Sequence, residues 1–228
     1  MIMEELKLVS NDCRSRMNEI LNASWKVFKW QFINKAFVNG ITSEASFQFH
    51  LASIIKSIGD MYVSPEEMFY VDIETKWNNK KIDITCGFCG PGEKQPLYNC
   101  AIELKFKRKR DSKGTFSADR IFKMYRDIDY LERETGVKGN DKDSCYSEGR
   151  FYLITDNSSY KDSEVESEGT VFGLKDGGTT STQPFRAENE SMQLTKAYPI
   201  VWDERESIGK SLSDKWYFLE IAVADVTK

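Results

Sequence analysis

The stretch CAIELKFKRKR, residues 100–110, carries a carboxylate and an amine two positions apart, at Glu103 and Lys105. Both alternate with apolar residues, which is the pattern of a β-strand with one polar and one apolar face. Side chains two positions apart on a strand share a face and lie about 6.6 Å apart. This spacing suits a carboxylate that binds a cation and an amine that holds a water molecule or a phosphate oxygen.

A second carboxylate, Asp83, lies in the stretch KIDITCGF, which is also typical of a strand, with Ile82 and Ile84 predicted to point to the opposite side. If the two strands pair, as consecutive strands often do, Asp83 and Glu103 share one face about 4.8 Å apart. Two carboxylates at that spacing repel each other unless a cation lies between them. Oxygen ligands of this kind favour Mg²⁺, or Mn²⁺ in its place.

A metal held by Asp83 and Glu103 would polarise a phosphate and lower the pKa of a bound water molecule. Lys105 would orient that water or offset charge that develops in the transition state. Glu44, at the start of a predicted helix, would add a third carboxylate through metal-bound water. The alternative for Glu44 is a carboxylate favoured by the positive end of the helix dipole. The alternatives for the others are a solvated strand face for Glu103 and Lys105 and a strand-edge charge for Asp83.

Helices and strands that would position these residues follow from the hydrophobic spacing. Helices are expected over residues 17–37, 43–59 and 117–134, with Ser43 and Ser117 as N-caps, and strands over 68–77, 81–88, 100–110, 150–156, 196–202 and 215–226. This order predicts an α/β fold with a mixed central β-sheet flanked by helices. We expect a single domain over residues 1–228, with an N-terminal helical region at 10–39, a core at about 44–156 and a loop-rich part at 157–228.

Composition narrows the class of protein. A chain of 228 residues with 40% hydrophobic and 13% aromatic residues can bury one core. No apolar run approaches the roughly 18 residues of a membrane span, and the acidic N-terminal stretch does not resemble a signal peptide. Five cysteines are an odd number, which favours free thiols in a reducing compartment. These features predict a cytoplasmic protein with no membrane partner.

Charge is distributed unevenly along the chain. The net charge is −4, yet residues 105–126 carry nine basic side chains and only two acidic ones. A local basic patch of this kind is typical of a phosphate-binding surface, although a solvated charged face gives the same pattern. The residues expected to contact a phosphate backbone are Lys107, Arg108, Lys109, Arg110, Lys113 and Arg120.

Asp83 followed by Glu103-Leu104-Lys105 resembles the motif of the PD-(D/E)xK nuclease superfamily, over residues 44–156. Ile82 stands where the motif name has Pro. The resemblance implies a restriction-endonuclease-like core and a Mg²⁺-dependent endonuclease that acts on DNA. It assigns catalytic roles to Asp83, Glu103 and Lys105, with Glu44 beside them, and metal binding to Asp83 and Glu103. Many such nucleases form homodimers.

Other interpretations stay open. A non-catalytic nucleic-acid-binding or assembly protein could retain the same fold and basic patch, and an interaction protein could carry the motif by coincidence. Cys86 and Cys89 form a CxxC pair that Cys100 could join at a zinc ion, but the sequence offers no evident fourth ligand. The single histidine, His50, flanks an apolar helix stripe, which favours packing over catalysis.

Overall fold

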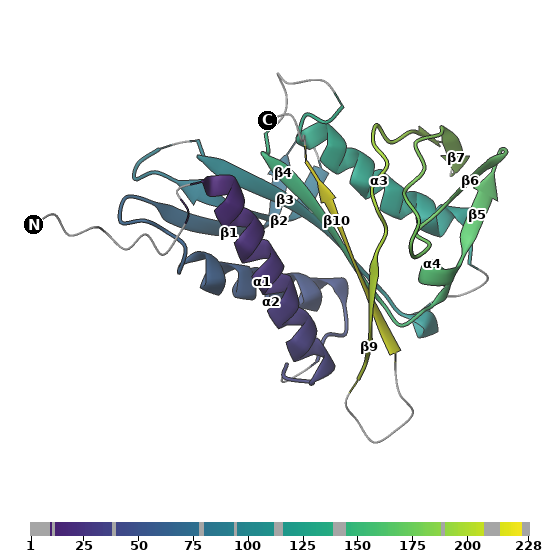
Figure 1. Ribbon diagram of the computed structural model, residues 1–228, viewed down its shortest axis with the longest axis horizontal. Coiled ribbons are helices and arrows are strands. Elements are labelled where there is room, and N and C mark those ends of the chain that lie inside the picture. Colours follow the sequence, from purple (N-terminus) through teal and green to yellow (C-terminus); the bar gives the residue numbers. More distant parts are fainter. Residues whose placement is uncertain are drawn as a thin grey trace, which may run out of the picture.

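A computed structural model describes residues 10, 12–37, 40–77, 80–93, 95–111, 116–138, 145–187, 190–207 and 215–224. The central element is a six-stranded sheet with the strand order β1-β2-β3-β4-β10-β9 (Figure 1). Its strands are β1 (Met68–Trp77), β2 (Lys80–Cys89), β3 (Tyr98–Lys107), β4 (Glu148–Thr155), β9 (Trp202–Glu206) and β10 (Lys215–Val223). Only the β3–β4 pair is parallel within this sheet, so the predicted mixed sheet is confirmed.

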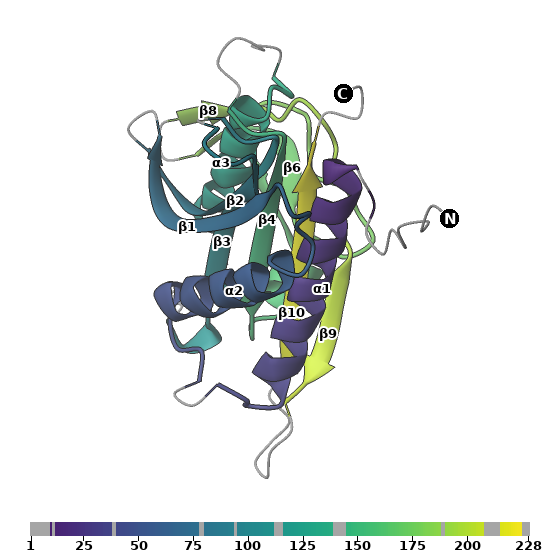
Figure 2. The ribbon, with the colours of Figure 1, turned by 90° about the vertical axis from the view of Figure 1, so that its left-hand side faces the viewer.

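Helices cover both faces of the sheet (Figures 1 and 2). On one face, α1 (Cys13–Ile33) and α2 (Glu44–Gly59) bury an aromatic-rich core against β2, β3 and β10. On the other face, α3 (Ala118–Glu134) packs against β3, β4 and β10. Parallel strands need a long crossover, and α3 provides it between β3 and β4. Both faces of β3 are therefore covered, which removes most of its side chains from bulk water.

The helix starts show how local sequence sets these elements. Asp12 accepts hydrogen bonds from backbone amides at the start of α1, which begins and ends four residues earlier than the predicted helix. Ser43 forms a capping box with Ser46, as its predicted N-cap role requires. Ser117 occupies the N-cap position of α3 but makes no side-chain cap hydrogen bond. Within the described residues, no helix is both long and apolar enough to cross a membrane.

The C-terminal part contains more regular structure than the sequence predicts. The predicted loop-rich part at 157–228 includes the short helix α4 (Ser159–Asp162). It also includes the short strands β5 (Glu164–Ser167), β6 (Thr170–Gly173), β7 (Phe185–Ala187) and β8 (Glu190–Met192), which form two small two-stranded sheets. The predicted strand at 196–202 is wrong, because β9 starts only at Trp202. Pro199, which has no amide to donate, makes just an isolated bridge with Thr179. The predicted last strand at 215–226 is confirmed as β10 up to Val223, and residues 225 and 226 lie outside the described residues.

Candidate active site where two strands separate

The candidate site lies where β2 separates from β3. Their ladder runs from Phe88 opposite Tyr98 to Ile84 opposite Ile102, and β3 then continues without this partner. Two side-chain carboxylates bind the amides beyond that point. Leu104 N donates to Asp83 Oδ2 at 2.7 Å, and Phe106 N donates to Glu44 Oε2 at 3.1 Å. Buried amides need acceptors, and these two hydrogen bonds position the carboxylates of Asp83 and Glu44 at the unpaired edge of β3.

Asp83 also marks an irregularity in β2. Ile82 packs in the core beneath α3, whereas Ile84 packs in the core beneath α1 and α2. Their predicted common face is therefore wrong, because the regular alternation of the strand breaks between them. The ladder with β1 skips the position between Glu74 and Asp83, and Glu74 has a left-handed φ of 53°. The break lets the Asp83 carboxylate reach the edge of β3.

The hydrogen bond from Leu104 N predicts different outcomes for two substitutions of Asp83. Asp83→Ala leaves a buried amide without its acceptor and should lower the free energy of unfolding by roughly 1–3 kcal/mol. Asp83→Asn keeps a carbonyl oxygen in place and should cost less than about half of that. Urea denaturation of the three proteins measures the difference, and equal losses in both variants would show that this hydrogen bond does not matter for stability.

Glu103 and Lys105 extend from β3 toward α3, where they meet a carboxylate that the sequence analysis missed. Lys105 Nζ lies 2.7 Å from Asp127 Oδ2 and 3.9 Å from Glu44 Oε1. Lys80 Nζ lies 3.5 Å from both Glu103 Oε1 and Asp127 Oδ1. Glu103 is only 3% exposed. The site thus holds two buried carboxylates with two ammonium groups between and beside them.

Of the site residues that the sequence analysis missed, Asp127 could have been found from its position in the helix, whereas Lys80 and Gln48 could not. Asp127 lies three residues after Met124 and four before Leu131, which are both buried on α3. A charged residue at such an inward helical position is a sign of a buried ion pair or a functional site. Lys80 follows a turn sequence and gives no such signal. Gln48, whose side-chain amide donates to the Asp83 carbonyl oxygen, is likewise an ordinary helix residue in sequence.

Burial and like charges shift the carboxylates toward their protonated forms. The pKa of Glu103 rises to about 8, first because burial removes it from water and then because Asp127 and Asp83 are negative neighbours. Burial also raises the pKa of Asp83. For Lys105, burial opposes the charged form, but Asp127 and Glu44 outweigh it and raise the pKa of the ammonium group. The site therefore favours positive charge and resists further negative charge.

A cavity of about 420 Å³ opens beside this cluster. Glu44, Lys105 and Asp127 line it, whereas Asp83 and Glu103 lie outside its lining. Five of its other charged lining residues are basic, namely Lys107, Arg108, Arg120, Lys123 and Arg126, and one, Asp111, is acidic. A mostly basic wall beside Lys105 is suited to an anionic ligand.

Three of the predicted phosphate contacts, Lys107, Arg108 and Arg120, line this cavity. Lys109 and Arg110, in the 3₁₀ helix Lys109–Asp111, are exposed outside the lining. The prediction for Lys113 lies outside the described residues. Some of the basic groups have internal counterions: Lys107 Nζ lies 3.7 Å from Glu44 Oε2, and Arg108 Nε lies 3.5 Å from Asp156 Oδ2.

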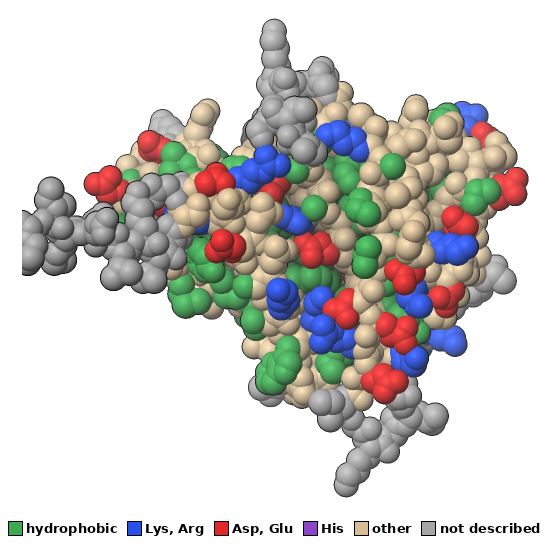
Figure 3. Space-filling model, viewed as in Figure 1, with side chains coloured by type: hydrophobic (Ala, Val, Ile, Leu, Met, Phe, Trp, Pro, Cys, Tyr) green, Lys and Arg blue, Asp and Glu red, His purple; other side chains and the backbone are tan. Residues whose placement is uncertain are grey.

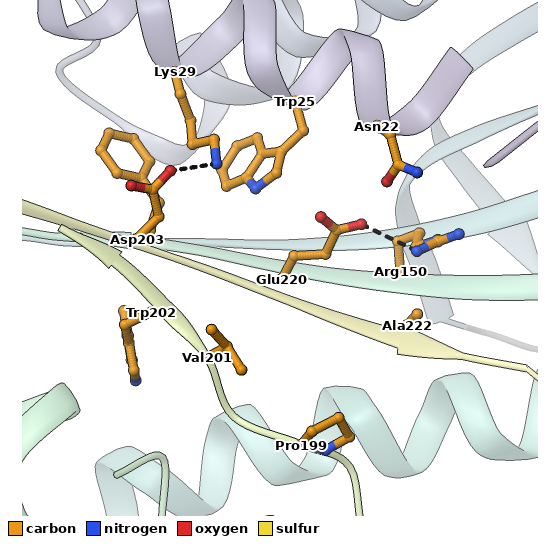
Figure 4. Close-up of a pocket in the computed structure, with 11 residues that line it drawn as sticks. Asn22, Trp25, Lys29, Arg150, Pro199, Val201, Trp202, Asp203, Glu220 and Ala222 are labelled. Atoms are coloured by element: carbon orange, nitrogen blue, oxygen red, sulfur yellow. Dashed lines mark hydrogen bonds and ion pairs between the residues drawn. The ribbon is translucent and has the colours of Figure 1, made fainter. Parts of the chain in front are cut away.

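A second cavity, of about 460 Å³, lies between α1 and the β9–β10 edge of the sheet (Figure 4). Its charged residues form pairs with each other: Lys29 Nζ lies 2.6 Å from Asp203 Oδ2, and Arg150 Nη1 lies 3.0 Å from Glu220 Oε1. Basic and acidic side chains are also intermingled on the face shown in Figure 3. The cavity at Lys105, with its excess of basic side chains, is therefore the better candidate for an anionic substrate.

Cys86, Cys100 and His50 have packing roles. Cys86 and Cys100 lie opposite each other on β2 and β3, fully buried in the core beneath α1 and α2. His50 lies against the Phe37 ring at 4.4 Å between ring centroids, and burial lowers the pKa of its imidazole. Across the described part of the chain, no three or more His, Cys, Asp or Glu side chains are arranged to hold a metal ion by themselves.

Comparisons with protein-family models, curated proteins and solved structures returned no match.

Proposed function

We propose that this chain is a divalent-metal-dependent nuclease, an endonuclease acting on DNA, with a restriction-endonuclease-like core. One observation carries the proposal: Glu44, Asp83, Glu103 and Lys105, which lie far apart in sequence, meet where β2 leaves β3, beside a cavity with a mostly basic wall. The motif resemblance motivates the choice of DNA, and the basic wall supports an anionic polymer as substrate.

The residues present fit a divalent cation. Glu103 Oε1 is buried without a hydrogen-bond partner, and Asp83 uses its Oδ2 for Leu104 N. Glu103 and Asp83 would hold the ion together with water and phosphate oxygens, which Mg²⁺ normally retains. The bound ion would supply Lewis-acid activation of the phosphate and of a water molecule.

The chain's own residues would do the rest of the work. The basic wall of the cavity would hold the phosphodiester backbone beside Lys105. Asp127 fixes the Lys105 ammonium at 2.7 Å, so this cation is preorganised where negative charge develops in the transition state. Glu44 lies near both Lys105 and Lys107 and can orient either ammonium group toward the substrate.

The test is a nicking assay of supercoiled plasmid, linear duplex, single-stranded DNA and RNA with Mg²⁺ or Mn²⁺. We expect cleavage of DNA by the wild-type protein that stops when a chelator is added. Absence of cleavage with every substrate and both ions would contradict the proposal.

A non-catalytic nucleic-acid-binding role is the second candidate, because the basic cavity wall would serve it equally well. It predicts an affinity for duplex DNA that falls steeply with added salt, without cleavage under any ion. Fluorescence anisotropy with a labelled duplex at several salt concentrations, run beside the nicking assay, separates the two functions.

A further inference from the structure

Lys80 occupies an unusual place among the charged groups of the site. Its ammonium lies 3.5 Å from Glu103 Oε1 and 3.5 Å from Asp127 Oδ1. It also lies 3.7 Å from the centroid of the Tyr130 ring, which adds a cation–π contact. A positive group between two buried carboxylates and over an aromatic face stands where a bound cation would be most stabilised.

The fit of Lys80 to the two carboxylates is loose. Both of its nitrogen–oxygen distances exceed those of a charge-assisted hydrogen bond, about 2.7–2.9 Å. Glu103 Oε1 has no hydrogen-bond partner although Glu103 is 3% exposed. By contrast, Lys105 binds the other oxygen of Asp127 at 2.7 Å. From the described residues, Asp127 Oδ1 accepts only the 3.5 Å hydrogen bond from Lys80. These two oxygens, Glu103 Oε1 and Asp127 Oδ1, therefore retain capacity for a stronger cation.

The position of Lys80 also allows its ammonium group to move away from the two carboxylates into solvent. It is the first residue of β2, and its side chain is 34% exposed, compared with 15% for Lys105. A long lysine stem can move its ammonium into solvent at little cost. Lys105, which is more buried and held more tightly, stays in place.

We infer that Glu103 and Asp127 form a divalent-cation site in which Lys80 is a tethered occupant that the incoming metal ion displaces. This inference rests on the proposed function for the position of the metal, and it adds Asp127 as a ligand and Lys80 as a competitor. Lys80 would thereby lower the affinity of the site for a metal ion, since the ion must compete with its ammonium group at the same two carboxylates.

Titration calorimetry with Mn²⁺ alone tests the competition. Lys80→Met keeps most of the side-chain stem and removes the charge. It should bind Mn²⁺ about tenfold more tightly than wild type, the size expected from removing one partly exposed charge near the ligands. Lys81→Met is the matched control, because Lys81 is the next residue but pairs with Glu74 at 2.7 Å. Equal affinities of the two variants would overturn the inference.

Asp127→Asn placed in the Lys80→Met background tests the ligand assignment. We expect this double variant to lose at least about tenfold in Mn²⁺ affinity relative to Lys80→Met, since a neutral amide is a poorer ligand than a carboxylate. Unchanged affinity would remove Asp127 from the site and overturn the inference.

A measurement on the wild-type protein covers the case in which a variant misfolds. Acetylation with acetic anhydride, mapped by peptide mass spectrometry, should increase at least about twofold at Lys80 when Mn²⁺ is added, as the freed amine enters solvent. Acetylation of Lys81 should not change. No change at Lys80 would overturn the inference.

These outcomes separate the inference from the proposed function. Cleavage by wild type without tighter binding by Lys80→Met would retain the nuclease and reject the displacement. Tighter binding without any cleavage would retain the displacement and reject the nuclease.

Discussion

Lys105→Met should cleave DNA roughly 10²- to 10⁴-fold more slowly than the wild-type protein, which is the usual cost of removing one preorganised charged group from a transition state. The apolar stem of methionine should keep the packing between β3 and α3. Affinity for a non-cleavable oligonucleotide should fall only modestly, because the other basic residues of the cavity wall remain. Single-turnover cleavage and anisotropy binding measure the two quantities.

Two controls make the Lys105 result interpretable. Lys215→Met removes an exposed lysine that pairs with Glu204 on β9, and it should cut at the wild-type rate. Lys105→Met leaves Asp127 without its closest cation, so the variant should lose stability, whereas Lys105→Met/Asp127→Asn should regain part of it. If Lys105→Met is folded and cuts as fast as wild type, Lys105 has no catalytic role.

Glu103→Gln should make the protein more stable at alkaline pH when a chelator is present. The pKa of this carboxyl rises from 4.5 to about 8 on folding. Between those pH values the unfolded chain has released a proton that the folded protein keeps, so the wild-type free energy of unfolding falls as pH rises. Glutamine cannot ionise and removes this contribution.

The two proteins should have similar stabilities near pH 5 and differ by on the order of 1–3 kcal/mol at pH 8.5, in favour of Glu103→Gln. Urea denaturation across this pH range measures the difference. Glu66→Gln, at an exposed position, is the control and should follow the wild-type curve. A pH dependence of Glu103→Gln that equals that of wild type would show that Glu103 ionises normally in the folded protein.

Hydrophobic periodicity predicts much of this fold because each helix and strand must bury one side against the sheet. It gives α2 with its Ser43 cap, the pairing of β2 with β3, and the mixed sheet. It fails at Asp83, where the strand alternation reverses, because this break depends on the partner strands and not on local sequence. The same reason explains why Lys80 is missed: its significance comes from Glu103 and Asp127, which lie on other elements.

The early end of the β2–β3 ladder bears on how relatives of this chain should be interpreted. Asp83 and Glu44 each accept a hydrogen bond from an amide of β3 that would otherwise lack an acceptor. They therefore stabilise the fold, and a protein without catalytic activity would also be expected to retain them. Glu103 gains no comparable stabilisation, because it is buried, lacks a hydrogen bond at one oxygen and is costly to ionise. Among the acidic residues of the candidate site, retention of Glu103 across relatives would therefore be the more informative sign of chemistry, while retention of Asp83 and Glu44 would report on the architecture of the sheet.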